Sequence, residues 1–105
     1  KKNDLEIAVV LKSLAWNCRF ADKDVTDLIT LFHIVHRHRA QLSGWRLDES
    51  SLAGTRGDAV KALQLLAERV DQGRWDTAFP PGVSPAHFSA LIRRHTQPRH
   101  AVRVR

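Results

Sequence analysis

Apolar residues recur every three or four positions in four separate stretches of this chain, and this spacing constrains the fold more than any other feature. A period of about 3.6 residues places such side chains on one face of an α-helix. The sequence therefore predicts four amphipathic helices whose apolar faces pack together. The residues expected on these inner faces are Leu5, Ala8, Val9, Leu11, Leu14, Ala15 and Cys18; Val25, Leu28, Ile29, Leu31, Phe32, Ile34, Val35 and His36; Ala59, Ala62, Leu63, Leu66, Ala67 and Val70; and Phe88, Leu91, Ile92 and His95.

Residues that begin or end helices lie between these stretches. The first helix is expected over about 4–18. The second is expected to begin at Asp22, because the carboxylates of Asp22, Asp24 and Asp27 suit a helix N-terminus. The other boundary signals are Ser43-Gly44 as the end of the second helix, the capping box Thr55-Arg56-Gly57-Asp58 and Gly73 as the ends of the third, and Ser84-Pro85 and Pro98 as the ends of the fourth.

The connections between the helices are expected to be irregular. The segment 74–83 contains two prolines and cannot be regular helix, and 45–54 is treated as a second connector. No two neighbouring segments alternate polar and apolar residues as the strands of a hairpin do. We predict an all-α fold: a compact bundle of four main helices with a long proline-containing connection, in a single domain over 1–98 with a basic tail over 99–105.

The tryptophans and the single cysteine each have a structural interpretation. Trp16, Trp45 and Trp75 lie near helix ends or in connectors, where we expect them to close the ends of the core; stacking against nucleic-acid bases is the alternative. Cys18 lies on an apolar helical face and is expected to be a small core residue. One cysteine cannot form an internal disulfide, which favours a reducing compartment, the cytoplasm.

Positive charge dominates the second half of the chain. The 105 residues include 17 Lys and Arg against 11 Asp and Glu, a net charge of +6. Residues 1–54 hold eight basic and seven acidic residues, whereas 55–105 hold nine and four, and Arg outnumbers Lys twelve to five. The planar fork of Arg suits phosphates and base edges. This balance is typical of nucleic-acid contact, and an ordinary domain from an arginine-rich proteome is the alternative.

No complete catalytic, cofactor or metal site is visible in the sequence. The longest apolar run, 7–11, is five residues, whereas a membrane helix needs about 20, so a membrane partner is not expected. His33, His36 and His38 lack the further ligands that zinc needs. The acids within 22–24 lack the strand and the third acid of a nucleotidyl-transfer site, and helix capping accounts for them. No phosphate loop or serine elbow occurs, so enzymatic chemistry within this chain is not expected.

Two clusters of basic residues lie at the ends of the second and fourth helices. Cations there complement the helix dipole, which is their structural interpretation. The functional interpretation is contact with phosphates, and the arginines of the tail are equally suited to a nucleic-acid arm or to a solvated tail. The candidate nucleic-acid-binding residues are Arg37, His38 and Arg39; Arg93 and Arg94; and Arg99, Arg103 and Arg105 in the tail.

One part of the chain resembles the helical domain that follows the catalytic domain in plasmid and phage primase-polymerases. The shared features over 14–40 are a small-residue and Phe lead-in, an acidic helix start, an Ile/Leu pair and a basic helix end. They are carried by Cys18-Arg19-Phe20-Ala21-Asp22-Lys23-Asp24-Val25-Thr26-Asp27-Leu28-Ile29 and by His36-Arg37-His38-Arg39, although Ala40 stands where a Gly commonly closes that helix. The resemblance implies an accessory module that grips template DNA or nucleotide, with Arg37, His38 and Arg39 as template contacts.

We therefore expect a helical nucleic-acid-binding module that contacts single-stranded or primed template DNA within a larger replication protein. Its catalytic carboxylates would belong to a covalently linked catalytic domain outside this chain. The start at Lys1-Lys2 and the absence of Met fit an excised piece. The alternative is a helical protein–protein interaction domain, or a small phage-type regulator, whose basic face meets an acidic partner.

Overall fold

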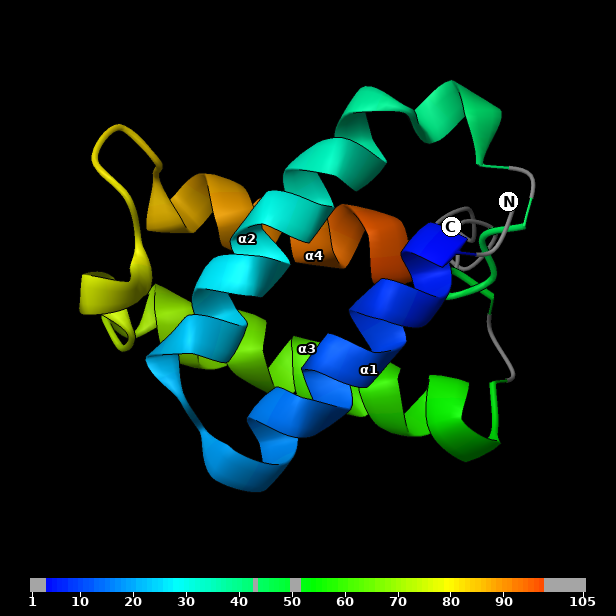
Figure 1. Ribbon diagram of the computed structural model, residues 1–105, viewed down its shortest axis with the longest axis horizontal. Helices are drawn as coiled ribbons and strands as arrows, with labels where there is room; N and C mark the ends of the chain where they lie inside the picture. The colour runs from blue at the N-terminus through cyan, green and yellow to red at the C-terminus, as the bar shows by residue number, and fades with distance from the viewer. Residues whose placement is uncertain (1–3, 43, 50–51, 98–105) are drawn as a thin grey trace, which may run out of the picture.

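The computed structural model describes residues 4–42, 44–49 and 52–97 of the chain. Within these residues it contains four α-helices, two short 3-10 helices and no β-strand, which confirms the predicted all-α fold (Figure 1). In chain order the elements are α1 (Asp4–Arg19), α2 (Asp22–Arg37), η1 (Arg39–Gln41), α3 (Gly54–Asp71), η2 (Asp76–Ala78) and α4 (Pro85–Thr96).

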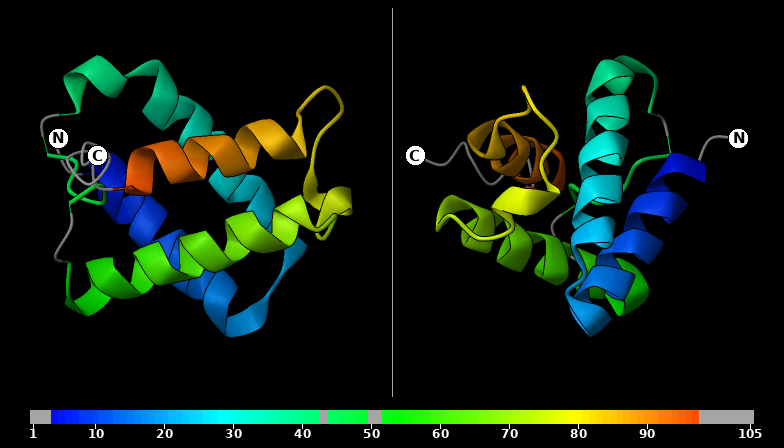
Figure 2. Two further views of the ribbon diagram at one scale, coloured as in Figure 1. Left: turned by 180° about the vertical axis from the view of Figure 1, so that it is seen from behind. Right: turned by 60° about the vertical axis from the view of Figure 1, so that its left-hand side comes forward.

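The four α-helices pack as two crossing pairs. α1 lies beside α2, α3 lies beside α4, and the first pair crosses the second (Figures 1 and 2). Across the crossing, α1 contacts α3 and α2 contacts α4, while η2 packs against α2. The α2–α4 contact brings together the two helix ends near which the predicted basic clusters lie.

Aromatic rings fill the core where α2 meets α4. Phe88 of α4 packs edge to face against Phe32 of α2 and Phe79 of the long connection, with ring centroids 6.1 and 5.6 Å apart. Full burial of such a side chain contributes about 1.5–3 kcal/mol. The predicted inner faces of α3 and α4 are buried. That of α2 is narrower than expected, because Leu31 is half-buried and Ile34 is 38% exposed.

The buried face of α1 differs from the predicted one. Cys18 is exposed rather than in the core, and Leu11 is 62% exposed. Glu6 and Ser13 are buried instead, together with Val9, Val10 and Trp16. The polar pair is accommodated because it is bonded: Ser13 Oγ donates to the Val9 carbonyl at 2.6 Å, and the Glu6 carboxylate accepts from Arg56 Nε at 2.8 Å and from the backbone N–H of Arg46.

Helix boundaries follow the sequence signals at some ends and not at others. Ser84 caps α4 as predicted, its Oγ accepting the His87 N–H at 3.2 Å, and α3 stops before Gly73, whose φ is +86°. α2, however, ends at Arg37 rather than near Ser43-Gly44, which lies partly outside the described residues. The Arg39 guanidinium donates to the His36 carbonyl at 2.5 Å. It thereby supplies a hydrogen-bond donor to one of the last carbonyl groups of the helix.

The predicted capping box of α3 is not formed. Ala53 precedes the helix in an extended conformation and makes no side-chain cap bond, and the helix begins at Gly54, whose φ is +65°. Gly57 approaches the backbone so closely that a Cβ there would lie 2.9 Å from the Leu52 carbonyl oxygen. Backbone geometry that glycine permits therefore sets this start in place of the Thr55 hydroxyl.

Two of the tryptophans have the core role expected of them. Trp16 is fully buried and packs edge to face against Phe20 and Trp75, at centroid distances of 5.1 and 5.9 Å. Arg69 lies over the outer ring, Phe20, at 5.5 Å from its centroid. This cluster closes the end of the bundle where α1 turns into α2.

A buried carboxylate fixes the α1–α2 turn. α2 begins at Asp22 with Asp24 in its first turn, as predicted, but the N-cap position is Ala21 and the Asp24 side chain is fully buried. Its two oxygens accept from Arg19 Nε and Nη2 at 2.8 and 2.9 Å, and Lys12 Nζ lies 3.6 Å away. These hydrogen bonds from Arg19, which outweigh desolvation, hold the pKa of Asp24 below its ordinary value of 3.8.

We predict that Asp24→Asn lowers the free energy of unfolding by about 1.5–3 kcal/mol, because a charge-assisted bidentate contact is lost at a buried position. Urea denaturation at neutral pH measures it. Asp27→Asn is the matched control: Asp27 is half-buried and pairs with Lys12 at 2.8 Å, so its loss is expected to stay below about 1 kcal/mol. Equal losses in the two variants would contradict a special role for Asp24.

Candidate nucleic-acid interface

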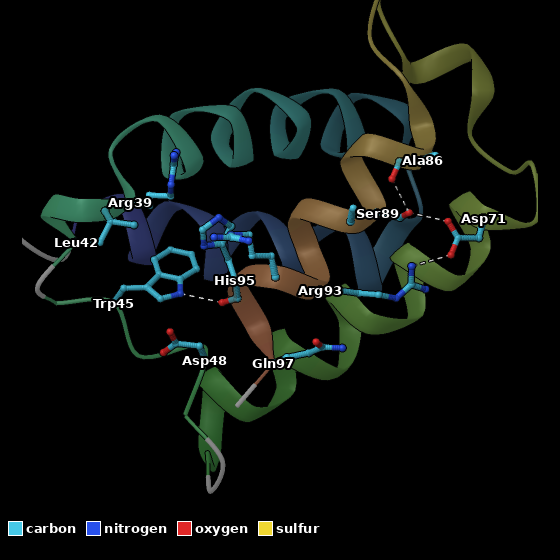
Figure 3. Close-up of a pocket in the computed structure, with 12 residues that line it drawn as sticks. Arg39, Leu42, Trp45, Asp48, Asp71, Ala86, Ser89, Arg93, His95 and Gln97 are labelled. Atoms are coloured by element: carbon cyan, nitrogen blue, oxygen red, sulfur yellow. Dashed lines mark hydrogen bonds and ion pairs between the residues drawn. The ribbon is translucent and has the colours of Figure 1, made fainter. Parts of the chain in front are cut away.

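A groove of about 850 Å³ runs along α4 toward η1 and the connector after it (Figure 3). α4 supplies one wall, and η1 with the connector after it supplies the other. The C-terminal end of α3 closes it through Asp71. The lining residues are Arg39, Leu42, Trp45, Asp48, Asp71, Ala86, Ser89, Ala90, Arg93, Arg94, His95 and Gln97. The groove therefore collects residues from both halves of the sequence.

The groove joins members of the two predicted basic clusters. Arg39, from η1 just after α2, and Arg93 and Arg94, from α4, all line it. Arg37 and His38 are exposed beside Arg39 but do not line it. The predicted contacts Arg99, Arg103 and Arg105 lie outside the described residues, as does the whole tail.

The arginines at this site differ in their partners. Arg93 Nη1 pairs with Asp71 at 2.7 Å, and the Ser89 hydroxyl donates to the same carboxylate at 2.6 Å, so this end of the groove is internally neutralised (Figure 3). Arg37, Arg39 and Arg94 are exposed, and no carboxylate of the described residues forms an ion pair with them. Their charge is therefore available to an external anion. Arg39 uses one donor at the His36 carbonyl, and its guanidinium has others.

Two pairs of histidines lie between α2 and α4. His36 Nδ1 and His95 Nε2 lie 3.1 Å apart and share a hydrogen bond, and the rings of His33 and His87 lie 5.7 Å apart between centroids. Burial lowers the pKa of His36 below 6.5, and the positive charges of Arg39 and Arg94 lower it further, as do His87 and His33. Basic groups that are far apart in the sequence thus lie close enough in the fold to disfavour protonation of His36.

Trp45 also belongs to this site, although the sequence indicates stacking on bases only as an alternative for the three tryptophans and does not place Trp45 among the candidate binding residues. Trp45 Nε1 donates to the His95 carbonyl at 2.8 Å, and the two rings meet edge to face with centroids 6.3 Å apart. The following residue, Arg46, donates its backbone N–H to the buried Glu6 carboxylate. Both contacts link positions at least 40 residues apart, so no local pattern identifies them.

Other chemistries find little support in the described residues. No three His, Cys, Asp or Glu side chains of 4–42, 44–49 and 52–97 gather as metal ligands. The Asp22 carboxylate accepts from the Thr77 hydroxyl at 2.7 Å, and the Asp24 carboxylate accepts from Arg19. Nor does any helix in this part of the chain have the length and apolar character to cross a bilayer.

Comparisons of the chain with family models, with curated proteins and with solved structures give no significant match. The resemblance to the primase-polymerase helical domain thus stays a prediction. What the site can do follows from its own groups: exposed arginines that can bind an anion, beside a half-buried indole.

We predict that acid destabilises the fold through His36. Because its pKa is lowered in the folded state, the unfolded chain binds more protons as the pH falls below about 6.5, and the free energy of unfolding decreases there. Denaturation at about pH 7.5 and about pH 5.5 measures this slope. His36→Gln is expected to reduce it, whereas the matched substitution of an exposed histidine, His38→Gln, keeps it. An unchanged slope in His36→Gln would contradict the assignment.

Proposed function

We propose that this chain is a nucleic-acid-binding helical module that contacts single-stranded or primed DNA within a larger replication protein. One observation carries the proposal: Arg39 and Arg94, from opposite halves of the sequence, line one groove, and no carboxylate of the described residues pairs with either. Arg37 adds a third unpaired charge next to this groove. The part in replication is supported only by the resemblance of residues 14–40 to the primase-polymerase domain.

Binding would be driven by phosphate contacts. A guanidinium offers a planar fork of donors that matches two phosphate oxygens, and the contact displaces counterions from the nucleic acid. Affinity then falls steeply as salt rises. The neutralised Arg93–Asp71 pair contributes less, because a phosphate would have to compete with a carboxylate already 2.7 Å from the guanidinium. The phosphate backbone of the nucleic acid is therefore expected to run along Arg37, Arg39 and Arg94.

An acidic protein partner is the second candidate, because the same unpaired arginines would attract carboxylates. The two candidates differ in competition. Unlabelled single-stranded DNA should displace a labelled oligonucleotide at low micromolar concentration, whereas poly-glutamate should displace it only when present in large excess. A pull-down that retains a specific protein after nuclease treatment, with no measurable DNA binding, would favour the acidic partner instead.

We predict that replacing Arg39 and Arg94 together with Gln weakens oligonucleotide binding and reduces the slope of log affinity against log salt by about one to two, because each phosphate contact contributes about 0.7 for single strands. Fluorescence anisotropy over a salt series measures this slope. The Arg39 side chain also donates a hydrogen bond to the His36 carbonyl at the end of α2, so its loss can affect the helix. Circular dichroism must therefore confirm that the variant keeps its helical structure.

The matched control is the double variant Lys61→Gln and Arg74→Gln. It also removes two positive charges, but at exposed positions that do not line the groove. Its salt slope is expected to stay within about 0.5 of the wild-type value. Equal effects of the two double variants would show that binding depends on net charge alone, and absence of binding at micromolar protein and low salt would refute the proposed function.

A further inference from the structure

Of the three tryptophans, only Trp45 lines the groove (Figure 3). Trp16, in the last turn of α1, is fully buried and packs against Trp75. The indole N–H groups of both are buried with no hydrogen-bond partner among the described residues. These two rings serve the core through their apolar surface. Trp45 is different, because it is half-buried in a connector and its polar edge is bonded.

Trp45 is held in place before any ligand arrives. Its Nε1–H donates to the His95 carbonyl, and the backbone of the next residue is tied to the buried Glu6 carboxylate. His95 is itself bonded to His36 on the other helix. A ring anchored on one edge loses little conformational freedom when a ligand packs on it, which favours binding at this position.

The groove also offers unpaired cations beside this ring. Arg39 and Arg94 line the same groove as Trp45; Arg94 belongs to α4, and Arg39 begins η1, which follows α2. Proteins that bind single strands combine such groups: arginines follow the phosphates while bases stack on aromatic side chains. In a duplex the base faces are covered by their neighbours. Only a single strand, a loop or a frayed end presents a base to an indole.

We propose that Trp45 is a base-stacking residue, so that the groove takes an unstacked base of single-stranded nucleic acid while the flanking phosphates contact Arg39 and Arg94. This inference rests on the proposed function, since phosphate contact brings the strand to the groove. It adds a specific residue and a class of ligand: a strand that has free bases, rather than any polyanion.

The test compares two ligands that carry the same phosphates. One is a labelled oligothymidylate of about eight nucleotides, and the other is an oligomer of equal length with abasic sugars. The wild-type chain is expected to bind the thymidylate about tenfold more tightly, the ratio of one stacked base.

Two substitutions then assign the preference to Trp45. Trp45→Leu is expected to bring the ratio between the two ligands close to one, with the abasic affinity retained. Trp45→Phe keeps an aromatic ring and is expected to retain most of the preference. If Trp45→Leu fails to fold, two other measurements decide. One is the ratio of the wild-type affinities for the thymidylate and the abasic oligomer. The other is the quenching of tryptophan emission by thymidylate, which should be smaller in Trp45→Phe than in the wild-type chain.

The outcomes separate this inference from the proposed function. Equal binding of both ligands by the wild-type chain overturns base stacking but leaves phosphate binding intact. A tenfold preference that survives Trp45→Leu overturns the assignment to Trp45. Binding of neither ligand at low salt overturns the proposed function, and the inference with it.

Discussion

The packing of α2 on α4 is the interaction on which the rest of the site depends. The Phe32–Phe88 contact anchors it, His36 meets His95 further along both helices, and Arg39 and Arg94 follow at the groove. This order gathers positive charge around a half-buried histidine. Burial of each phenylalanine contributes about 1.5–3 kcal/mol, whereas repulsion between exposed charges costs at most about 1 kcal/mol. Apolar packing therefore holds the basic groups together against their mutual repulsion.

Two buried carboxylates fix the segments around this core. Asp24 holds the α1–α2 turn through Arg19, and Glu6 joins α1 to Arg56 of α3 and to the backbone of Arg46 in the connector. A buried charge without such partners would be strongly unfavourable, so each carboxylate permits few arrangements of the chain around it. Glu6 is the more consequential for the candidate site, because it is bonded to the connector that carries Trp45. The site thus depends on a residue that lies 40 positions earlier in the chain.

Prediction succeeded where local rules suffice. The 3.6-residue period identified all four helices, and Ser84-Pro85 and Gly73 gave correct boundaries. It failed where a distant partner overrides a local preference. The apolar pattern places Leu11 and Cys18 on the inner face of α1, but both are exposed, whereas Glu6 and Ser13, which the pattern does not include, are buried with bonded partners. Asp24 lies in the first turn of α2 as predicted, but its burial depends on the approach of Arg19, which no local rule indicates.

Four amphipathic helices, a long proline-containing connection and arginines concentrated at two helix ends follow from the order of residues alone, because period, chain breakers and charge are local properties. Which of those arginines share a site depends on how the helices pack. The packing places Arg39 and Arg94 in one groove, pairs Arg93 with Asp71, and sets Trp45 in the same groove. These placements depend on contacts between residues far apart along the chain, and the pattern within any one helix carries no information about such contacts.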